Sequence, residues 1–420
     1  MHNFISIVMN KILEPVSERY LKDIAEASQM SAQEIYDHLL NECKIKNEIL
    51  PINEGTIIFG TPGCSHNIRT GIHCGCSFCD WNDSYVVNPA YAVVLRRKSK
   101  ELYQKMQSKT LEILRGSGIC SQVFEEYAIH DCFDNDQISN EEIEALLSGK
   151  NFKSFPYIGL VQVRAESVTK EKIEIWKKGT KRVLTLGIGI ETGNEWIRNH
   201  WLNKGLPDNA IMNAINIAHW NQCKVTGNLL MMIPGITLRQ NLSLLVNSIK
   251  KLVDMGCDSV MLSPLVKKRY TIQNLLNERT NKYNIYYIIQ VIDCLSKLDG
   301  AYRDKIMLST INFMDFMESN FEETREISNL SVNFGTLLNL GGMKNFSGFI
   351  QGVNETINSE AYMAYSKAFE ALDGIECLRE QFRKSAHLLV TKLFDINEQK
   401  QLEKLFLNEL DGFEGEYAEI

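Results

Sequence analysis

The chain has 420 residues, 44% hydrophobic and 23% charged, with a formal net charge of −7. This composition is that of a large globular protein, and it argues against one that grips a nucleic-acid backbone through a basic excess. The longest apolar runs, such as 229–233, are far shorter than the roughly 20 residues that cross a bilayer. The N-terminus also lacks the pattern of a secretory signal. We therefore expect a cytoplasmic protein that makes no membrane contact.

The first fifty residues predict a helical N-terminal extension, taken as 1–50. Two amphipathic segments, 17–27 and 31–43, have the apolar spacing of helices. Ser31 and Glu34 have the spacing of a capping box, which marks the start of the second helix. The sequence does not identify the partner of this extension.

The next part of the chain, taken as 51–275, alternates strand-like and helix-like segments. The clearest helix places Leu245, Ile249 and Leu252 on one face, and Gly256 has the position of a left-handed cap. Short apolar runs without alternation predict buried parallel strands. We predict strands at 56–60, 126–130, 159–164, 185–190, 225–232 and 259–262. The fold class is therefore α/β, a six-unit (β/α)6 partial TIM barrel, whose active site lies at the carboxyl ends of the strands.

Beyond the barrel, residues 276–420 predict a mostly helical C-terminal region. The segment 398–410 has a helical pattern, and 331–342 is rich in Gly and Asn, which predicts a loop. The barrel thus has helical extensions at both ends.

Four of the eleven cysteines fall within sixteen residues, directly after the first predicted strand. They are Cys64, Cys74, Cys76 and Cys79. A structural zinc is one interpretation, but such sites draw on two separated knuckles and this chain has one Cys-x-x-Cys here and no second pair downstream. The other interpretation is that three cysteines bind three irons of a four-iron cluster. The position on the first loop of a barrel favours the iron–sulfur cluster, and the scattered cysteines are expected to be small buried residues.

A cysteine triad on the first loop of a six-unit barrel, with Phe78 before the last cysteine, resembles the radical S-adenosylmethionine (SAM) superfamily. Eleven residues separate Cys64 from Cys76, and two separate Cys76 from Cys79. A long first gap is most similar to the group that contains the Elongator catalytic subunit and the radical SAM subunit of archaeosine synthase. The resemblance implies Cys64, Cys76 and Cys79 as ligands, with Cys74 as a spectator or a substitute ligand, and Phe78 beside the adenine.

The resemblance also implies SAM-binding residues at the ends of the other strands. Asp131 or Asp134 stands where the superfamily often carries a carboxylate for the methionine amino group, although a solvated loop is equally compatible. Arg164 and Glu166 suit a carboxylate and ribose hydroxyls, although a structural ion pair is equally compatible. The remaining candidates are Glu191, followed one helix later by the segment 202–205, then Pro234 and Gly235 after the fifth strand, and Leu265 after the sixth.

The implied function is that of a radical SAM enzyme with a [4Fe-4S] cluster and S-adenosyl-L-methionine as cofactors. Reductive cleavage of SAM would give a 5′-deoxyadenosyl radical that abstracts hydrogen from a peptide or small-metabolite substrate. Cys132 is the candidate catalytic hydrogen donor, against the alternative of a buried structural thiol. The electron donor would be a flavodoxin or ferredoxin. Two other interpretations stay open: a tRNA-modifying radical enzyme, and a zinc-stabilised binding protein without catalysis.

Overall fold

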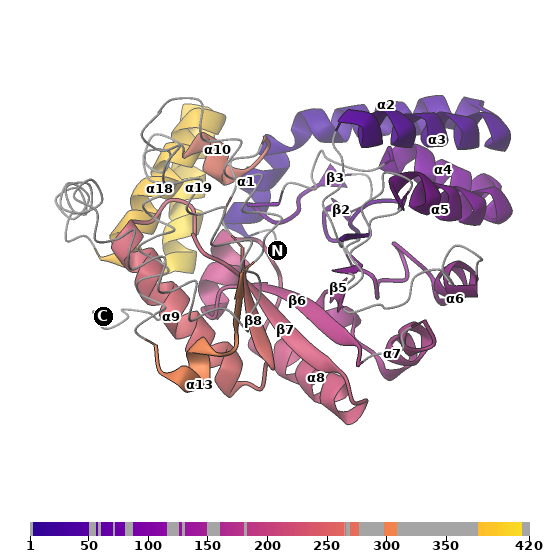
Figure 1. Ribbon diagram of the computed structural model, residues 1–420. Helices are drawn as coiled ribbons and strands as arrows, with labels where there is room; N and C mark the ends of the chain where they lie inside the picture. Colours follow the sequence, from indigo (N-terminus) through magenta and orange to yellow (C-terminus); the bar gives the residue numbers. More distant parts are fainter. Residues whose placement is uncertain are drawn as a thin grey trace, which may run out of the picture. The chain divides into compact units, whose positions relative to one another are not determined.

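The structure is a computed structural model, whose helices and strands Figure 1 labels, and the chain forms two compact units. Unit 1 comprises Met1–Val8, Ile190–Gly205 and Gly227–Ile420, and unit 2 comprises Met9–Gly189 and Leu206–Thr226. The residues described are 3–49, 56–57, 60–69, 72–79, 87–115, 126–127, 131–148, 160–179, 183–263, 265, 269–276, 298–308 and 377–413. No helix in these ranges is long and apolar enough to span a bilayer.

One sheet of seven strands carries the fold, and its order follows the chain. The strands are β1 (Thr56–Ile57), β4 (Glu126–Tyr127), β5 (Leu160–Val163), β6 (Thr185–Glu191), β7 (Lys224–Leu230), β8 (Ser259–Ser263) and β9 (Ile306–Leu308). The four pairings with a defined register, β1–β4, β4–β5, β5–β6 and β8–β9, are all parallel. An order that never reverses is the topology of a partial barrel, whereas a doubly wound sheet reverses at a switch point. The predicted α/β fold is confirmed, and β9 adds a seventh strand.

Helices alternate with the strands. Between β1 and β4 lie α4 (Pro89–Lys98) and α5 (Lys100–Arg115), and after them come α6 (Asn140–Ser148), α7 (Lys170–Lys177), α8 (Asp208–Trp220) and α9 (Leu238–Asp254). In α9, Ile249 and Leu252 are fully buried, as the apolar pattern predicts. Gly256 has a φ of 108°, which confirms the left-handed end. A Cβ on Gly227 of β7 would lie 2.5 Å from Leu252, so glycine allows α9 to approach the sheet closely.

The N-terminal helices are α1 (Phe4–Ile12), α2 (Glu14–Gln29) and α3 (Ala32–Ile49). The capping box is present: Ser31 N–H donates to Glu34 Oε2 at 2.7 Å, and Glu34 N–H donates to Ser31 Oγ at 3.2 Å. Helices α2 and α3 share one apolar cluster with α4 and α5, which includes Ile35, Tyr91 and Tyr103. These helices therefore pack within unit 2.

The described C-terminal part of unit 1 is mostly helical. It contains α10 (Ile272–Leu275), α13 (Gly300–Arg303), α18 (Leu378–Leu393) and α19 (Ile396–Leu410), and α19 confirms the predicted helix. The rings of Trp196, Trp201, Phe382 and Phe406 lie within 6.2 Å of one another in the contacting pairs and bring α18 and α19 together with the segment after β6. The predicted loop at 331–342 lies outside the described residues.

Candidate active site

The chain between Cys64 and Cys76 folds back as a hairpin of β2 (Ile68–Arg69) and β3 (Ile72–His73). At its base the Asn67 carbonyl accepts the N–H of Cys74 at 2.9 Å. Asn67 Oδ1 accepts the N–H of the next residue, Gly75, at 3.0 Å. The hairpin therefore closes the long gap between the first two predicted ligands.

The Cys64 carbonyl accepts the Asn67 N–H at 3.0 Å, so the hairpin base is tied to Cys64 as well, and Cys64, Cys76 and Arg164 all belong to unit 2. Burial raises the pKa of the Cys64 thiol to about 11, while Arg164 acts to lower it and Cys76 raises it further. Burial acts to lower the pKa of the Arg164 guanidinium, whereas Glu166, Cys76 and Cys64 act to raise it. Two predicted ligands and one predicted SAM-binding residue thus belong to the same unit and influence one another's pKa.

Cys79 follows Cys76 in a tight turn, in which the Cys79 N–H donates to the Cys76 carbonyl at 3.2 Å. The side chains of Cys74, Phe78 and Cys79 are half-buried. Within the described ranges no group of three His, Cys, Asp or Glu side chains stands in a metal-binding arrangement. Three thiols in one loop nevertheless match the donor chemistry of an iron–sulfur cluster.

The loop after β4 carries two carboxylates of interest: Asp131 is buried, and Asp134 is hydrogen-bonded to the cysteine loop. Asp131 is 1% exposed and accepts from Ser167 Oγ at 2.5 Å and from the Phe133 N–H at 3.0 Å. Burial raises the pKa of Asp131 to about 6. Asp134 accepts a hydrogen bond from Ser65 Oγ, which links this loop to the cysteine loop. Asp134 therefore has an anchoring contact, and Asp131 is a buried carboxyl beside the end of β5.

At the end of β5, Arg164 pairs with Glu166 at 2.6 Å, and their side chains are 11% and 39% exposed. Cys132 is fully buried: its N–H donates to the Gln162 carbonyl at 3.0 Å, and its carbonyl accepts from Trp176 Nε1 at 3.3 Å. The contacts fix Cys132 in the interior of unit 2. A role for it as a hydrogen donor stays a prediction.

In unit 1, the last residue of β6 is Glu191, whose backbone is strained. Glu191 has a φ of 69°, in the region that favours glycine, and its side chain pairs with Lys204 at 2.8 Å. Both side chains are 10% exposed. The fully buried Arg198 belongs to a π-helix, Ile197–Trp201, and its Nε donates to the Thr192 carbonyl at 3.2 Å. The two sequence segments predicted after β6 are therefore joined by a buried ion pair.

The turn after β7 carries Pro234 and Gly235, and Leu265 follows β8; all three residues are buried. Gly235 has a φ of 85°, so this position requires glycine. Trp201 Nε1 donates to the Pro234 carbonyl at 2.8 Å. These residues belong to unit 1, as Glu191 does, whereas the cysteines, Asp131 and Arg164 belong to unit 2.

Sequence reasoning did not identify several residues that hold these predicted sites. They are Ser65, Asn67 and Ser167 in unit 2, and Arg198 and Trp201 in unit 1. Asn67 is the one with a local signal, since it precedes the hairpin and Gly75 follows it. The others act across the fold, where a single sequence has no periodic pattern to mark them.

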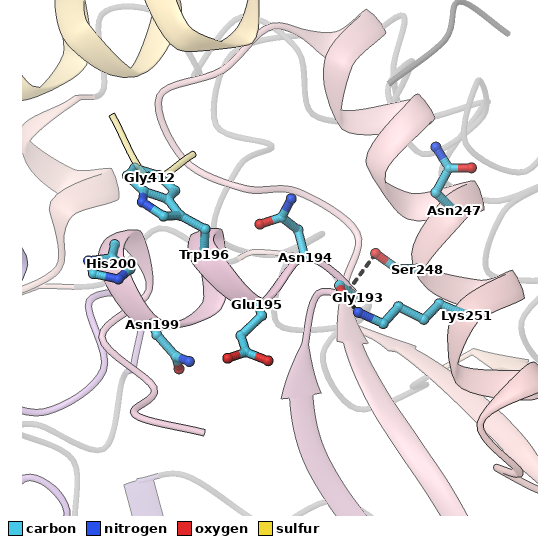
Figure 2. Close-up of a pocket in the computed structure, with 10 residues that line it drawn as sticks. All are labelled: Gly193, Asn194, Glu195, Trp196, Asn199, His200, Asn247, Ser248, Lys251 and Gly412. Atoms are coloured by element: carbon cyan, nitrogen blue, oxygen red, sulfur yellow. Dashed lines mark hydrogen bonds between the residues drawn. The ribbon is translucent and has the colours of Figure 1, made fainter. Parts of the chain in front are cut away.

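A polar pocket of about 440 Å³ lies in unit 1, beside the turn that follows Glu191. Figure 2 shows Ser248 and Lys251 of α9 directed at Gly193: the Gly193 N–H donates to Ser248 Oγ at 2.8 Å, and Lys251 Nζ donates to the Gly193 carbonyl at 2.8 Å. Trp196 and His200 line the other side. The pocket wall therefore fixes the backbone directly after Glu191 and Thr192.

No protein-family model matches the chain. An uncharacterized protein of Methanocaldococcus jannaschii is 23% identical over 138 residues, which are 33% of this chain and 38% of that protein. The chain thus spans well under half the length of this curated relative.

Several solved structures are similar at low identity. TsrM from Kitasatospora setae, a radical S-adenosylmethionine methyltransferase with cobalamin and a [4Fe-4S] cluster bound, is 11% identical over 72% of this chain and 60% of its own, with a TM-score of 0.39. Elp3 of Methanocaldococcus infernus is 13% identical over 65% of each chain (TM-score 0.36). Methylornithine synthase, PylB, is 13% identical over 81% and 99% (TM-score 0.38).

Proposed function

We propose that this chain is a radical SAM enzyme that binds a [4Fe-4S] cluster through Cys64, Cys76 and Cys79. The observation that supports the proposal is the closed hairpin between the first two predicted ligands: Asn67 is hydrogen-bonded to Cys64 on one side and to Cys74 and Gly75 on the other. This closure shortens the long first gap of the cysteine motif, as a shared cluster would require. Three thiolate ligands leave one iron of such a cluster open, which is the arrangement that binds SAM.

When bound, the cluster would supply the electron that cleaves the S–C5′ bond of SAM, giving methionine and a 5′-deoxyadenosyl radical. The residues of this chain would bind and orient SAM and the substrate, and would exclude water from them. Arg164 provides a fixed positive charge for the methionine carboxylate, and Glu166 holds the guanidinium at 2.6 Å. Asp131 provides a buried carboxyl at the end of β4, and Phe78 provides an apolar contact for the adenine.

In unit 1, the family resemblance implies further candidate SAM contacts, which are Glu191, Pro234, Gly235 and Leu265 after β6, β7 and β8. The radical would take a hydrogen from a peptide or small metabolite, yielding 5′-deoxyadenosine and a substrate radical. A flavodoxin or ferredoxin would supply the electron. The acidic charge of the chain favours these substrates over a nucleic acid.

The test is anaerobic reconstitution followed by assays of iron, sulfide and zinc, and then by addition of dithionite and SAM. About four irons and four sulfides per chain are expected, with release of 5′-deoxyadenosine. Cys76→Ala should lose both cluster and product, whereas the matched variant Cys74→Ala should keep them. One zinc, no sulfide and no 5′-deoxyadenosine would instead identify a zinc-stabilised binding protein without catalysis. Loss in Cys74→Ala alone would move the second ligand to Cys74.

A further inference from the structure

The turn after β7 is held by side chains from three separate elements. Asn241 of α9 accepts the Ile233 N–H at 2.6 Å and donates to the carbonyls of Ile233, Ile236 and Thr237 at 3.1–3.3 Å. Trp201 of the π-helix donates to the Pro234 carbonyl at 2.8 Å. Each carbonyl from 233 to 237 has a side-chain donor once α18 is included.

Helix α18 supplies the two remaining contacts. Ser385 Oγ donates to the Gly235 carbonyl at 2.6 Å, and Gln381 Oε1 accepts the Thr237 N–H at 2.7 Å. The side chains of Ser385 and Gln381 are 2% and 1% exposed; the Ser385 bond is buried, and the Gln381 bond is partly buried. A Cβ on Gly235 would lie 2.8 Å from Ser385 Oγ, which shows how closely helix and turn approach.

A turn held only by its own backbone would be free to adopt several conformations. Here Gly235 is kept at a φ of 85° by contacts whose partners lie far along the chain, 150 residues away for Ser385 and 144 residues from Thr237 for Gln381. Side chains that fix a loop in one conformation remove the entropy cost of ordering it when a ligand binds. The turn after β7 is therefore preorganised by the side chains that hold it.

We propose that Ser385 and Gln381 are positioning residues for the SAM-binding turn, so that the C-terminal helix α18 sets the affinity for SAM by acting through Pro234 and Gly235. This inference rests on the proposed function, in which Pro234 and Gly235 contact SAM. It gives α18 a role in the site although the helix begins more than 100 residues beyond β8.

The test uses full-length reconstituted protein in four forms: wild type, Ser385→Ala, Gln381→Met and Thr391→Ala. Thr391 is the matched control, because it is exposed on the same helix and its hydroxyl bonds to the carbonyls of His387 and Leu388 in that helix. The first readout is hydrogen exchange of peptides covering 231–240 in the protein without SAM. The second is the KM for SAM and the kcat for 5′-deoxyadenosine release.

We expect exchange in the turn to rise about tenfold in Ser385→Ala and Gln381→Met, because each loses one buried hydrogen bond. The KM for SAM should rise by a similar factor, about tenfold, while kcat stays within about twofold. Thr391→Ala should match wild type in both readouts. If one variant fails to fold, judged by its thermal melt, the other variant decides.

Two results would overturn the inference. Unchanged exchange in the turn would show that α18 does not hold it. Faster exchange with an unchanged KM would show that the turn is held for a reason unrelated to SAM. If wild type itself releases no 5′-deoxyadenosine, the proposed function fails, and the exchange data separate that outcome from a failure of positioning.

Discussion

Lys204 Nζ lies 2.8 Å from Glu191 Oε1, and both side chains are 10% exposed. Glu191 ends β6 with a φ of 69°, and Lys204 stands between Asn203 and Gly205, whose φ values are 55° and 62°. A buried pair on a strained backbone is energetically asymmetric. Removal of one partner leaves an uncompensated charge, whereas removal of both is far less costly.

Lys204→Met should therefore destabilise the protein by about 3 kcal/mol, because Glu191 would lose its ion-pair partner in a buried site. The measurement is urea unfolding of the variant against wild type. The double variant Glu191→Gln with Lys204→Met should recover most of the loss. If the double variant is as unstable as the single one, packing of the lysine stem, and not the ion pair, accounts for the effect.

Asp131 should make folding less favourable as the pH rises from about 4 to 6. The pKa of this carboxyl is about 6 in the folded protein against a usual value of 3.8, because burial disfavours the charged form. In this window the unfolded chain releases the proton and the folded protein keeps it, so stability falls with rising pH and levels off above pH 6. Asp134 and Lys172 are the charged groups that act on it.

The check compares wild type with Asp131→Asn by urea unfolding at several pH values between 4 and 7. The stability of wild type relative to the variant should fall by roughly 3 kcal/mol at most across this range, since one pKa unit corresponds to about 1.4 kcal/mol. A difference that is independent of pH would show that Asp131 titrates normally in the folded protein.

The strands were predictable because buried parallel strands leave a direct signal. Each of the six predicted segments overlaps a strand of the sheet, and successive residues of β6 and β7 are buried on both faces. The strand β9, Ile306–Leu308, was not predicted, because it lies in the region that the sequence pattern assigned to helices. The hairpin of β2 and β3 was not predicted either, because its two short strands lie between cysteines in a segment interpreted as a ligand loop.

The candidate residues at the strand ends came from the cysteine spacing and from a family resemblance, and the contacts that hold them could not have come from either. Ser385 and Gly235 are 150 residues apart, and Ser65 and Asp134 are 69 apart. Serine is a common residue with no pattern that distinguishes a surface hydroxyl from one that caps a distant carbonyl. Such pairings depend on the tertiary arrangement within each unit.

Glu409 should stabilise the N-terminal segment of unit 1. Its Oε1 accepts the Phe4 N–H at 2.7 Å, and its Oε2 lies 2.9 Å from His200 Nδ1. Because Phe4 is fully buried, Glu409→Ala leaves its N–H without this acceptor, at a cost of about 1–3 kcal/mol. Hydrogen exchange of residues 3–8 should accelerate together with the loss of stability in urea.

The matched control is Glu403→Ala on the same helix, which removes an ion pair with His387 whose side chains are 36% and 66% exposed. An exposed pair contributes little, so this variant should stay within about 0.5 kcal/mol of wild type. Glu409→Gln retains an acceptor oxygen and should restore most of the protection of residues 3–8. Equal effects of Glu403→Ala and Glu409→Ala would point to helix propensity as the common cause.

Gly75→Ala should impair cluster loading, because the hairpin base has no room for a side chain. A Cβ at this position would lie 2.6 Å from Asn67 Oδ1 and 2.9 Å from the Asn67 Cβ, so the hairpin must shift and move Cys76 relative to Cys64. We expect iron and sulfide content after reconstitution to fall at least about twofold, with the thermal melt of the remaining fold little changed, since the loop is local. Ile72→Ala is the control, because Ile72 lies on the same hairpin but is 46% exposed. Full loading of Gly75→Ala would mean that the positions of the two thiols do not depend on the closed hairpin, and the observation on which the proposed function rests would lose its force.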